Sequence, residues 1–206
     1  MRMKLKKKIK IKLNSKSLFI FLLTFSCLAL ISGIIFYIII NSGDKYRVSN
    51  DIENYFNIKE AYNYSKIFIT GFKTNTLNSL FIWLLGISII GIPIVFILLY
   101  MEFFSLGISI SALVNTYGFK SILAILFYIF PGKLLYLFII FILSFFSTKF
   151  SYKLIKIIFF KEEVNLNIYF KKYIRILILI TVLLVICSIS DTYISLFFIK
   201  LFNTLF

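Results

Sequence analysis

Histidine is absent from the chain, and only eight of its 206 residues are acidic. Histidine is the commonest general base and the commonest metal ligand, so its absence excludes Ser–His and Cys–His nucleophile systems. The sequence also lacks the phosphate-binding G-x-x-x-x-G-K-[ST] loop, the G-x-S-x-G nucleophile elbow and the H-E-x-x-H metal motif. We therefore predict a protein that is not an enzyme and that needs no metal or cofactor.

Cysteine is nearly as scarce. Cys27 and Cys187 are the only two, and each lies in a separate apolar run, where a small hydrophobic packing role is typical. No disulfide framework is indicated.

Asp191 is the one acid that the hydropathy pattern places inside an apolar run, and Glu102 is expected near the opposite membrane face. A membrane-embedded carboxylate pair of the aspartyl-protease type is therefore not predicted.

Apolar side chains, in contrast, make up 61% of the chain, and the mean hydropathy is +0.98. An average soluble domain is roughly 45–50% apolar. The charged residues are clustered between uncharged runs that match the roughly 20 residues needed to cross a hydrocarbon layer of ~30 Å. We predict an all-α fold, a single integral-membrane domain over 1–206, built as a polytopic transmembrane helical bundle of about five crossings. The predicted membrane segments are 18–40, 74–100, 103–131, 133–148 and 173–199.

Two of these segments contain helix-breaking residues. Pro93 lies inside 74–100, and proline removes a backbone donor and clashes with the preceding turn, so a kinked or broken helix is expected there. The segment 103–131 is interrupted near Gly118. It fits either one long broken helix or a helix followed by a half-helix.

The net charge of +15 is concentrated in two places. Eight basic residues fall in the tail 1–17, and seven more lie between 149 and 175. Since lysine and arginine beside membrane helices are retained on the cytoplasmic side, five crossings place the N-terminus and a basic loop, 149–172, in the cytoplasm, and 41–73 outside it. Because the basic residues flank apolar runs, nucleic-acid binding is not predicted.

The extracytoplasmic segment 41–73 is too short for an independent domain. Within it, Asn50–Glu53 resembles a helix N-cap with a capping-box acid, and Ile52, Tyr55 and Phe56 begin a helical apolar stripe. A short helix lying on the outer leaflet and an irregular wet loop both fit this pattern.

Small side chains recur in the third predicted segment. Ser105, Ser109 and Ala112 share one helical face, and Gly107 and Ser111 share another. Such faces allow helices to approach closely in lipid. Packing within the same chain is favoured over packing against a partner subunit.

Asp191 is the most unusual residue of the last segment. An ionisable side chain at the centre of a membrane helix costs ~2.5–3.5 kcal/mol on insertion scales, so it usually has a function or a partner. A helix over 173–199 would be about 40 Å long, which places Asp191 toward the outer boundary. Alternatively, the helix ends near Ser190 and leaves Asp191 in the wet interface. The partners expected for a buried Asp191 are side chains at the start of the second segment: Asn75, Thr76, Asn78 and Lys73.

The second segment carries the most specific pattern of the sequence. A polar, asparagine-bearing start leads into W-x-x-G-x-S-x-x-G-x-P, and generic hydrophobic helices do not place tryptophan, two glycines and proline at those intervals. Together with residues further along, this pattern resembles the stage II sporulation protein M family. The residues that carry the resemblance, and that we take as candidate structural or interaction residues, are Asn75, Asn78, Trp83, Gly86, Gly91, Pro93, Gly107, Pro131 and Asp191.

The resemblance covers nearly the whole chain, with three departures. Glu102 and Phe103 stand where the family commonly has a basic residue and a glycine. Gly132 and Lys133 replace a polar–asparagine pair. Asp191 stands where glutamate is usual.

The resemblance implies a role in endospore formation. Members of that family act as the polytopic anchor of an engulfment complex with two peptidoglycan-degrading proteins, which thin the septal wall while the mother-cell membrane migrates around the forespore. The chain would then be a multi-pass protein of the bacterial cell membrane, surrounded by membrane lipids, and a scaffold for peptidoglycan hydrolases at the sporulation septum. A homo-oligomer and a family paralogue outside sporulation both stay open.

The alternative from another class is a permease subunit of a transporter, because broken helices in a bundle can line a substrate path. The predicted membrane interior, however, offers almost no charge to bind a substrate or a coupling ion.

Overall fold

A computed structural model describes residues 14–56, 63–128, 132–161 and 165–205, and every element in these ranges is helical. This confirms the predicted fold class. The helices are α1 (Ser15–Ile39), α2 (Ser42–Phe56), α3 (Tyr64–Gly86), α4 (Gly91–Tyr117), α5 (Ser121–Tyr128), α6 (Leu134–Phe160), α7 (Leu166–Ile189) and α8 (Leu196–Leu205). A 3-10 turn, Gly118–Lys120, precedes α5, and a π-helical turn, Ser190–Ser195, joins α7 to α8.

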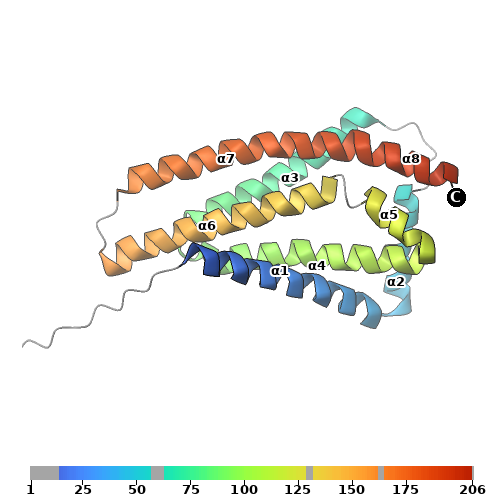
Figure 1. The fold of residues 1–206 in the computed structure, drawn as a ribbon, viewed down its shortest axis with the longest axis horizontal. Coiled ribbons are helices and arrows are strands. Elements are labelled where there is room, and N and C mark those ends of the chain that lie inside the picture. Colours follow the sequence, from blue (N-terminus) through green and yellow to red (C-terminus); the bar gives the residue numbers. More distant parts are fainter. Residues whose placement is uncertain (1–13, 57–62, 129–131, 162–164, 206) are drawn as a thin grey trace, which may run out of the picture.

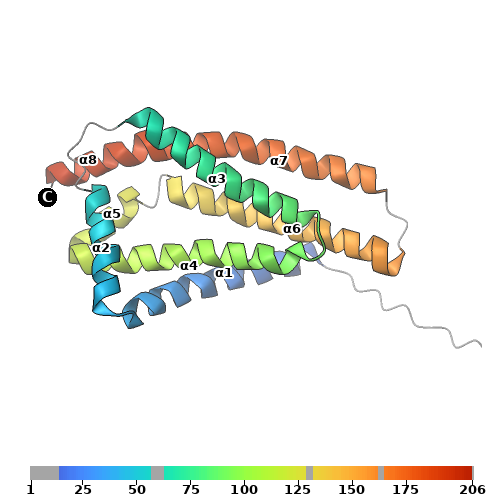
Figure 2. The same cartoon turned by 180° about the vertical axis from the view of Figure 1, so that it is seen from behind.

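The long helices lie side by side along the long axis of the molecule and alternate in direction (Figures 1 and 2). α1 runs out along the axis, α3 returns, α4 runs out, α6 returns and α7 runs out again. The shorter helices α2, α5 and α8 gather at one end of the bundle, where α2 lies across the long axis. The first residues of α1 and the connection between α6 and α7 lie toward the opposite end.

The end of the bundle at which α6 ends and α7 begins is the basic one. Lys16 lies in the first turn of α1, and further basic side chains lie along α6 and the first half of α7. Because basic residues beside membrane helices stay in the cytoplasm, we call this the cytoplasmic end and the end with α2, α5 and α8 the outer end. The basic residues on the two helices are Lys149, Lys153, Lys156, Lys171, Lys172 and Arg175.

Four helical stretches in the described ranges are long and apolar enough to cross a membrane: Ser15–Ile39, Gly91–Leu126, Leu134–Phe160 and Leu166–Leu201. The polytopic helical bundle is therefore confirmed. α3 follows the same axis as these stretches, but it carries Lys66 and Lys73 in its first half. Its apolar part is thus shorter than the second predicted segment.

The irregularity near Pro93 is a chain reversal, so the prediction of one segment over 74–100 needs correction. α3 ends at Gly86, a short turn follows, and α4 begins at Gly91 and runs back along the bundle. A β-carbon on Gly91 would overlap the backbone of Leu85, so the turn requires glycine there. Pro93 lies in the first turn of α4, where the N–H that proline lacks has no helical acceptor.

The reversal also moves the next boundaries. α4 continues through Glu102 to Tyr117, so the prediction that Glu102 separates two segments is wrong. The predicted break at Gly118 is confirmed: its φ of +54 ends α4, and glycine adopts such values at little cost. The 3-10 turn and the short α5 follow, which is the helix-plus-half-helix alternative. Pro131 lies outside the described residues.

Both helices of the cytoplasmic end extend further toward that end than predicted. α6 continues past 148 to Phe160, and α7 begins at Leu166, before 173. The predicted loop 149–172 is therefore largely helical, and all of its lysines except Lys161 lie on α6 or α7. The hydrophobic pattern underestimated both helices because it stopped at the first lysines.

The described residues between α1 and α3 form the helix α2, so the alternative of an irregular loop is wrong for 42–56. α2 begins at Ser42, so the N-cap predicted at Asn50 is wrong and Asn50 is an interior helical residue. Ile52 is buried, and the Tyr37 and Ser49 hydroxyls are 3.1 Å apart, which fastens α2 to the end of α1. The side chains of Tyr55 and Phe56 are outside the described part of the structure.

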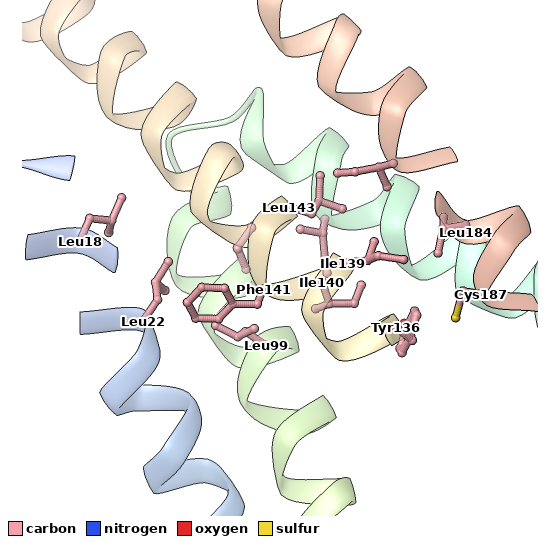
Figure 3. Packing of buried hydrophobic residues seen from close by; sticks show 13 residues of the cluster. Leu18, Leu22, Leu99, Tyr136, Ile139, Ile140, Phe141, Leu143, Leu184 and Cys187 are labelled. Carbon is pink, nitrogen blue, oxygen red and sulfur yellow. The ribbon is translucent and has the colours of Figure 1, made fainter. Parts of the chain in front are cut away.

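The closest helix pair is α1 with α4. A β-carbon on Gly33 would overlap the carbonyl of Phe104, and one on Gly107 would overlap the carbonyl of Leu30. The two backbones therefore meet at facing glycines, an arrangement common among membrane helices. The main apolar core lies beside this crossing and draws on α1, α4, α6 and α7, as Figure 3 shows for Leu22, Leu99, Ile140 and Leu184.

Candidate functional site

A group of mostly buried or half-buried polar side chains, with the exposed Asn78 at its edge, lies where α3, α4, the first turn of α6 and the π-helical turn meet. Glu102 is about 16 Å along α4 at about 1.5 Å per residue, close to the middle of a ~30 Å hydrocarbon layer. Its side chain is 19% exposed, and that of Lys133 is 35% exposed. We call this group the polar cluster; its members are Asn78, Glu102, Gly132, Lys133, Tyr136, Cys187 and Asp191.

Glu102 is the acceptor at the centre of the polar cluster. The Tyr136 hydroxyl donates to Oε1 of Glu102 at 3.1 Å, and Nδ2 of Asn78 donates to the same oxygen at 3.4 Å. The other oxygen, Oε2, is 3.5 Å from Nζ of Lys133. Asn78 also donates to the Tyr136 hydroxyl oxygen at 3.3 Å, which closes the network. Tyr136 itself is buried at the edge of the apolar core (Figure 3). One carboxylate thus links α3, α4 and α6.

Asp191 adds a second carboxylate on the π-helical turn. A β-carbon on Gly132 would overlap the carboxyl group of Asp191, so the carboxylate packs directly on this glycine. The Cys187 thiol lies 3.3 Å from the carbonyl oxygen of Gly132 and 4.0 Å from Oδ2 of Asp191. Lys133 interacts electrostatically with Asp191 as well as with Glu102. Lys133 therefore pairs with Glu102 and also attracts the carboxylate of Asp191.

The partners predicted for Asp191 are not the ones found. α3 does pack against the π-helical turn, but Asn78 donates to Glu102 and Tyr136 instead of Asp191. The prediction failed because Glu102 was placed near the opposite membrane face, between the segments 74–100 and 103–131. With Glu102 inside α4, the nearest acceptor for Asn78 is a different carboxylate. Asp191 is also not the only acid within a membrane helix.

The three departures from the family pattern converge on this cluster. Glu102 bonds to Lys133, Lys133 follows Gly132, and Gly132 contacts Asp191. Positions that are far apart in the sequence are thus in contact here.

The polar cluster can hold charge in the bundle interior. A lone buried ion is costly, and pairing with hydrogen bonds offsets this cost. Two carboxylates share one ammonium group, and the π-helical turn beside them is a backbone form that frequently occurs at functional sites. In the described residues no group of His, Cys, Asp and Glu side chains could hold a metal ion.

A second polar site is built by the W-x-x-G-x-S-x-x-G-x-P stretch at the cytoplasmic end of α3. The Tyr173 hydroxyl of α7 donates to the carbonyl oxygen of Trp83 at 2.8 Å and lies 2.8 Å from Oγ of Ser147 on α6. Oγ of Ser151 lies 2.7 Å from the carbonyl oxygen of Gly86 and 2.8 Å from that of Ser88. These hydroxyls satisfy the last carbonyl groups of α3, which have no helical donor.

Aromatic stacking completes this second site. The Tyr173 ring is stacked between Trp83, at 5.2 Å between centroids, and Phe150, at 4.4 Å. A β-carbon on Gly86 would overlap both the Tyr173 hydroxyl and the Ser147 side chain. At this glycine, α3 therefore packs directly against α6 and α7. We call Trp83, Gly86, Ser147, Ser151 and Tyr173 the turn clamp.

The structure separates the residues predicted as site members. Asn78 and Asp191 belong to the polar cluster, Trp83 and Gly86 to the turn clamp, and Gly107 to the α1–α4 crossing. Gly91 and Pro93 form the α3–α4 reversal. Asn75 makes no hydrogen bond to either site within the described ranges, and Pro131 is not described.

Several site residues were missed from the sequence. Ser147 and Ser151 are one helical turn apart in an apolar run, a spacing that places both hydroxyls on one face of α6. That spacing could have identified the two serines as site residues. No sequence pattern marks Tyr136 and Tyr173, because tyrosine is common at membrane boundaries in any orientation.

The fold and these two sites define a multi-pass helical membrane protein with paired charges in its interior. The stage II sporulation protein M family matches residues 17–196, and the chain belongs to that family. The matched region includes the polar cluster, the turn clamp and most of every candidate span. No curated protein and no solved structure matches the chain. Family membership makes this a sporulation-related membrane protein.

Proposed function

We propose that the chain is a membrane scaffold that anchors peptidoglycan-degrading proteins at the sporulation septum during engulfment. The observation that carries this proposal is the family match over residues 17–196. In that role the protein performs no chemistry itself. It confines wall-degrading partners to the membrane surface and so raises their effective concentration at the wall.

The outer end of the bundle suits such a partner. α2 lies across this end and exposes Asp44, Arg47, Asn50 and Glu53, while Ile52 anchors it to the bundle. Its charged surface faces the compartment in which the cell wall lies. A polar helix held on a rigid support is a suitable docking surface for a soluble domain.

Contacts between helices inside the bundle support the anchoring role because they hold the bundle rigid. The turn clamp joins α3, α6 and α7 at the cytoplasmic end, and the polar cluster joins α3, α4 and α6 near the middle. Both depend on contacts between helices that are distant in the sequence. A bundle braced at two depths presents its outer end in one fixed geometry.

Affinity capture from sporulating cells in mild detergent, followed by mass spectrometry, tests the proposal. We expect peptidoglycan-degrading proteins to be enriched with the full chain. Reversing two exposed charges on α2, with Asp51→Lys and Glu53→Lys, should reduce their recovery. The matched control reverses two charges at the cytoplasmic end, with Lys161→Glu and Lys171→Glu, and should leave recovery unchanged. Capture of a transport ATPase without any wall-degrading protein would contradict the proposal.

One observation favours the permease alternative. The bundle interior holds Glu102, Lys133 and Asp191, and ionisable groups at this depth often mark an ion or substrate path. The variant Glu102→Gln with Lys133→Met removes one carboxylate and the ammonium group together, while the glutamine keeps an acceptor for Tyr136 and so keeps α4 joined to α6. A scaffold retains partner capture and engulfment in this variant, whereas a permease assembles normally but loses its function.

A further inference from the structure

A cavity of about 220 Å³ lies between α6 and α7 at the cytoplasmic end of the bundle. It differs from the polar cluster in both place and charge, because basic and aromatic side chains line it and none of its described lining residues carries a carboxylate. These side chains come from both α6 and α7. The lysines are Lys149, Lys153 and Lys172, and the aromatic residues are Phe146, Phe150, Tyr169 and Tyr173.

The three lysines gather positive charge, and none of the described residues that line the cavity is acidic. Lys149 and Lys153 are one helical turn apart on α6, and Lys172 faces them from α7. In the described part of the chain, both ion pairs lie elsewhere, one on α2 and one in the polar cluster. Like charges this close repel one another. An anion between them would turn the repulsion into attraction.

The cavity also has a firm aromatic and apolar wall. Tyr173 is 2% exposed and stacks on Phe150, and Nζ of Lys153 lies 2.8 Å from the centre of the Tyr169 ring. Phe146 and Ile176 extend the wall from the lysines along the two helices. A ligand with a charged head and an apolar body would match this order of side chains.

We propose that this cavity binds the phosphate group of an anionic phospholipid from the cytoplasmic leaflet. Basic pockets between membrane helices on the cytoplasmic side are suited to anionic headgroups, and the acyl chains would follow the apolar wall into the bilayer. Tyr173 also belongs to the turn clamp. A bound lipid would therefore brace the α6–α7 hairpin against α3.

A second cavity shows that volume alone does not make such a site. It measures about 400 Å³ and lies at the outer end, between α1, α2 and α4. Its one lysine, Lys45, donates to the carbonyl oxygen of Ile38 at 2.8 Å. Of these two cavities, only the one between α6 and α7 combines several lysines with a position at the cytoplasmic end of the bundle.

Native mass spectrometry of the purified full-length protein tests the proposal, with phosphatidylglycerol and phosphatidylcholine offered at equal concentration. We expect phosphatidylglycerol to be retained preferentially and to raise the melting temperature. Lys149→Gln, Lys153→Gln and Lys172→Gln together should weaken its retention by about tenfold or more, since each lysine near a membrane surface contributes about fivefold. The control, Lys156→Gln, Lys171→Gln and Arg175→Gln, removes the same charge outside the cavity and should retain the lipid.

A triple lysine-to-arginine variant at the three cavity positions should also retain the lipid, which keeps the test valid if the glutamine variant folds poorly. Equal loss in the cavity and control variants would show general surface attraction and overturn the proposal. So would equal retention of the two lipids. Displacement of phosphatidylglycerol by an equal concentration of inorganic phosphate would show a site for free phosphate, which overturns the lipid assignment.

Discussion

Among single residues, Glu102 and Lys133 set the strongest constraint on the interior. Each would be costly alone in a membrane helix, and each is tolerated because the other lies 3.5 Å away. Tyr136 and Asn78 supply the remaining donors to the carboxylate. The polar cluster is therefore a network in which Glu102 is the shared acceptor.

Removing the carboxylate should expose this dependence. We expect Glu102→Ala to lower stability by about 1–3 kcal/mol, because it leaves the Tyr136 hydroxyl without its acceptor and the Lys133 ammonium with only its electrostatic interaction with Asp191. Thermal unfolding in detergent measures the change. Adding Lys133→Met to Glu102→Ala should recover part of the loss. Additive losses in the double variant would mean that the two side chains are not coupled.

A substitution at Gly132 tests its contact with the Asp191 carboxyl group. Gly132→Ala places a methyl group where the Asp191 carboxyl group lies, so we expect a loss of about 1–3 kcal/mol from overpacking. In an Asp191→Ala background the space is free, and the same substitution should cost little. The comparison of melting temperatures across these four proteins checks the contact. An equal cost of Gly132→Ala in both backgrounds would rule it out.

At the scale of elements, the hairpin of α3 and α4 shows what the sequence reveals and what it hides. The helical class, the first membrane segment and the break at Gly118 follow from composition and local residue preferences. The reversal between Gly86 and Gly91 does not, because glycine and proline in an apolar run suit a kink as well as a turn. The deciding contacts come from Ser151 and Tyr173, which are more than sixty residues away.

The polar cluster was missed from the sequence for the same reason. Without the reversal between α3 and α4, Glu102 is read as the boundary of a segment, and the residues that contact it cannot be identified. The resemblance to a family selected Trp83, Gly86 and Asp191 but not the residues that contact them. Contacts between distant segments require the three-dimensional packing, which no local pattern encodes.

The turn clamp should hold this hairpin in place. We expect Tyr173→Phe, which keeps the stacked ring and removes its hydroxyl, to lower stability by about 1–3 kcal/mol through the lost bonds to Trp83 and Ser147. Tyr169→Phe on the preceding turn of α7 is the matched control. Equal melting temperatures for the two variants would show that the hydroxyl of Tyr173 contributes nothing.

The α1–α4 crossing has an internal control for glycine. Gly107→Ala should be destabilising by about 1–3 kcal/mol, because its methyl group meets the backbone of α1 at Leu30. Gly71, inside α3, has no atom within 4 Å of an added β-carbon. Gly71→Ala should therefore be neutral or stabilising, since alanine is the better helix former. Matching losses at the two sites would contradict close packing at Gly107.

For the whole molecule, the distribution of charge and the direction of the helices agree on one orientation. The basic α6–α7 hairpin and the start of α1 lie toward the cytoplasmic end, and α2 lies across the outer end. The proposed contact with wall-degrading partners lies on α2, and the proposed lipid site lies on the hairpin. The two proposals therefore concern opposite ends of the bundle, and each can be tested alone.

Site-specific photo-cross-linking in sporulating cells tests the central claim most directly. A photoreactive residue replaces Asn50 on α2 in one strain and Asn165, at the start of α7, in another; both side chains are exposed. The account predicts covalent adducts with peptidoglycan-degrading proteins from position 50 and none from position 165. Adducts with these proteins only from position 165, or from neither position in cells that complete engulfment, would contradict it.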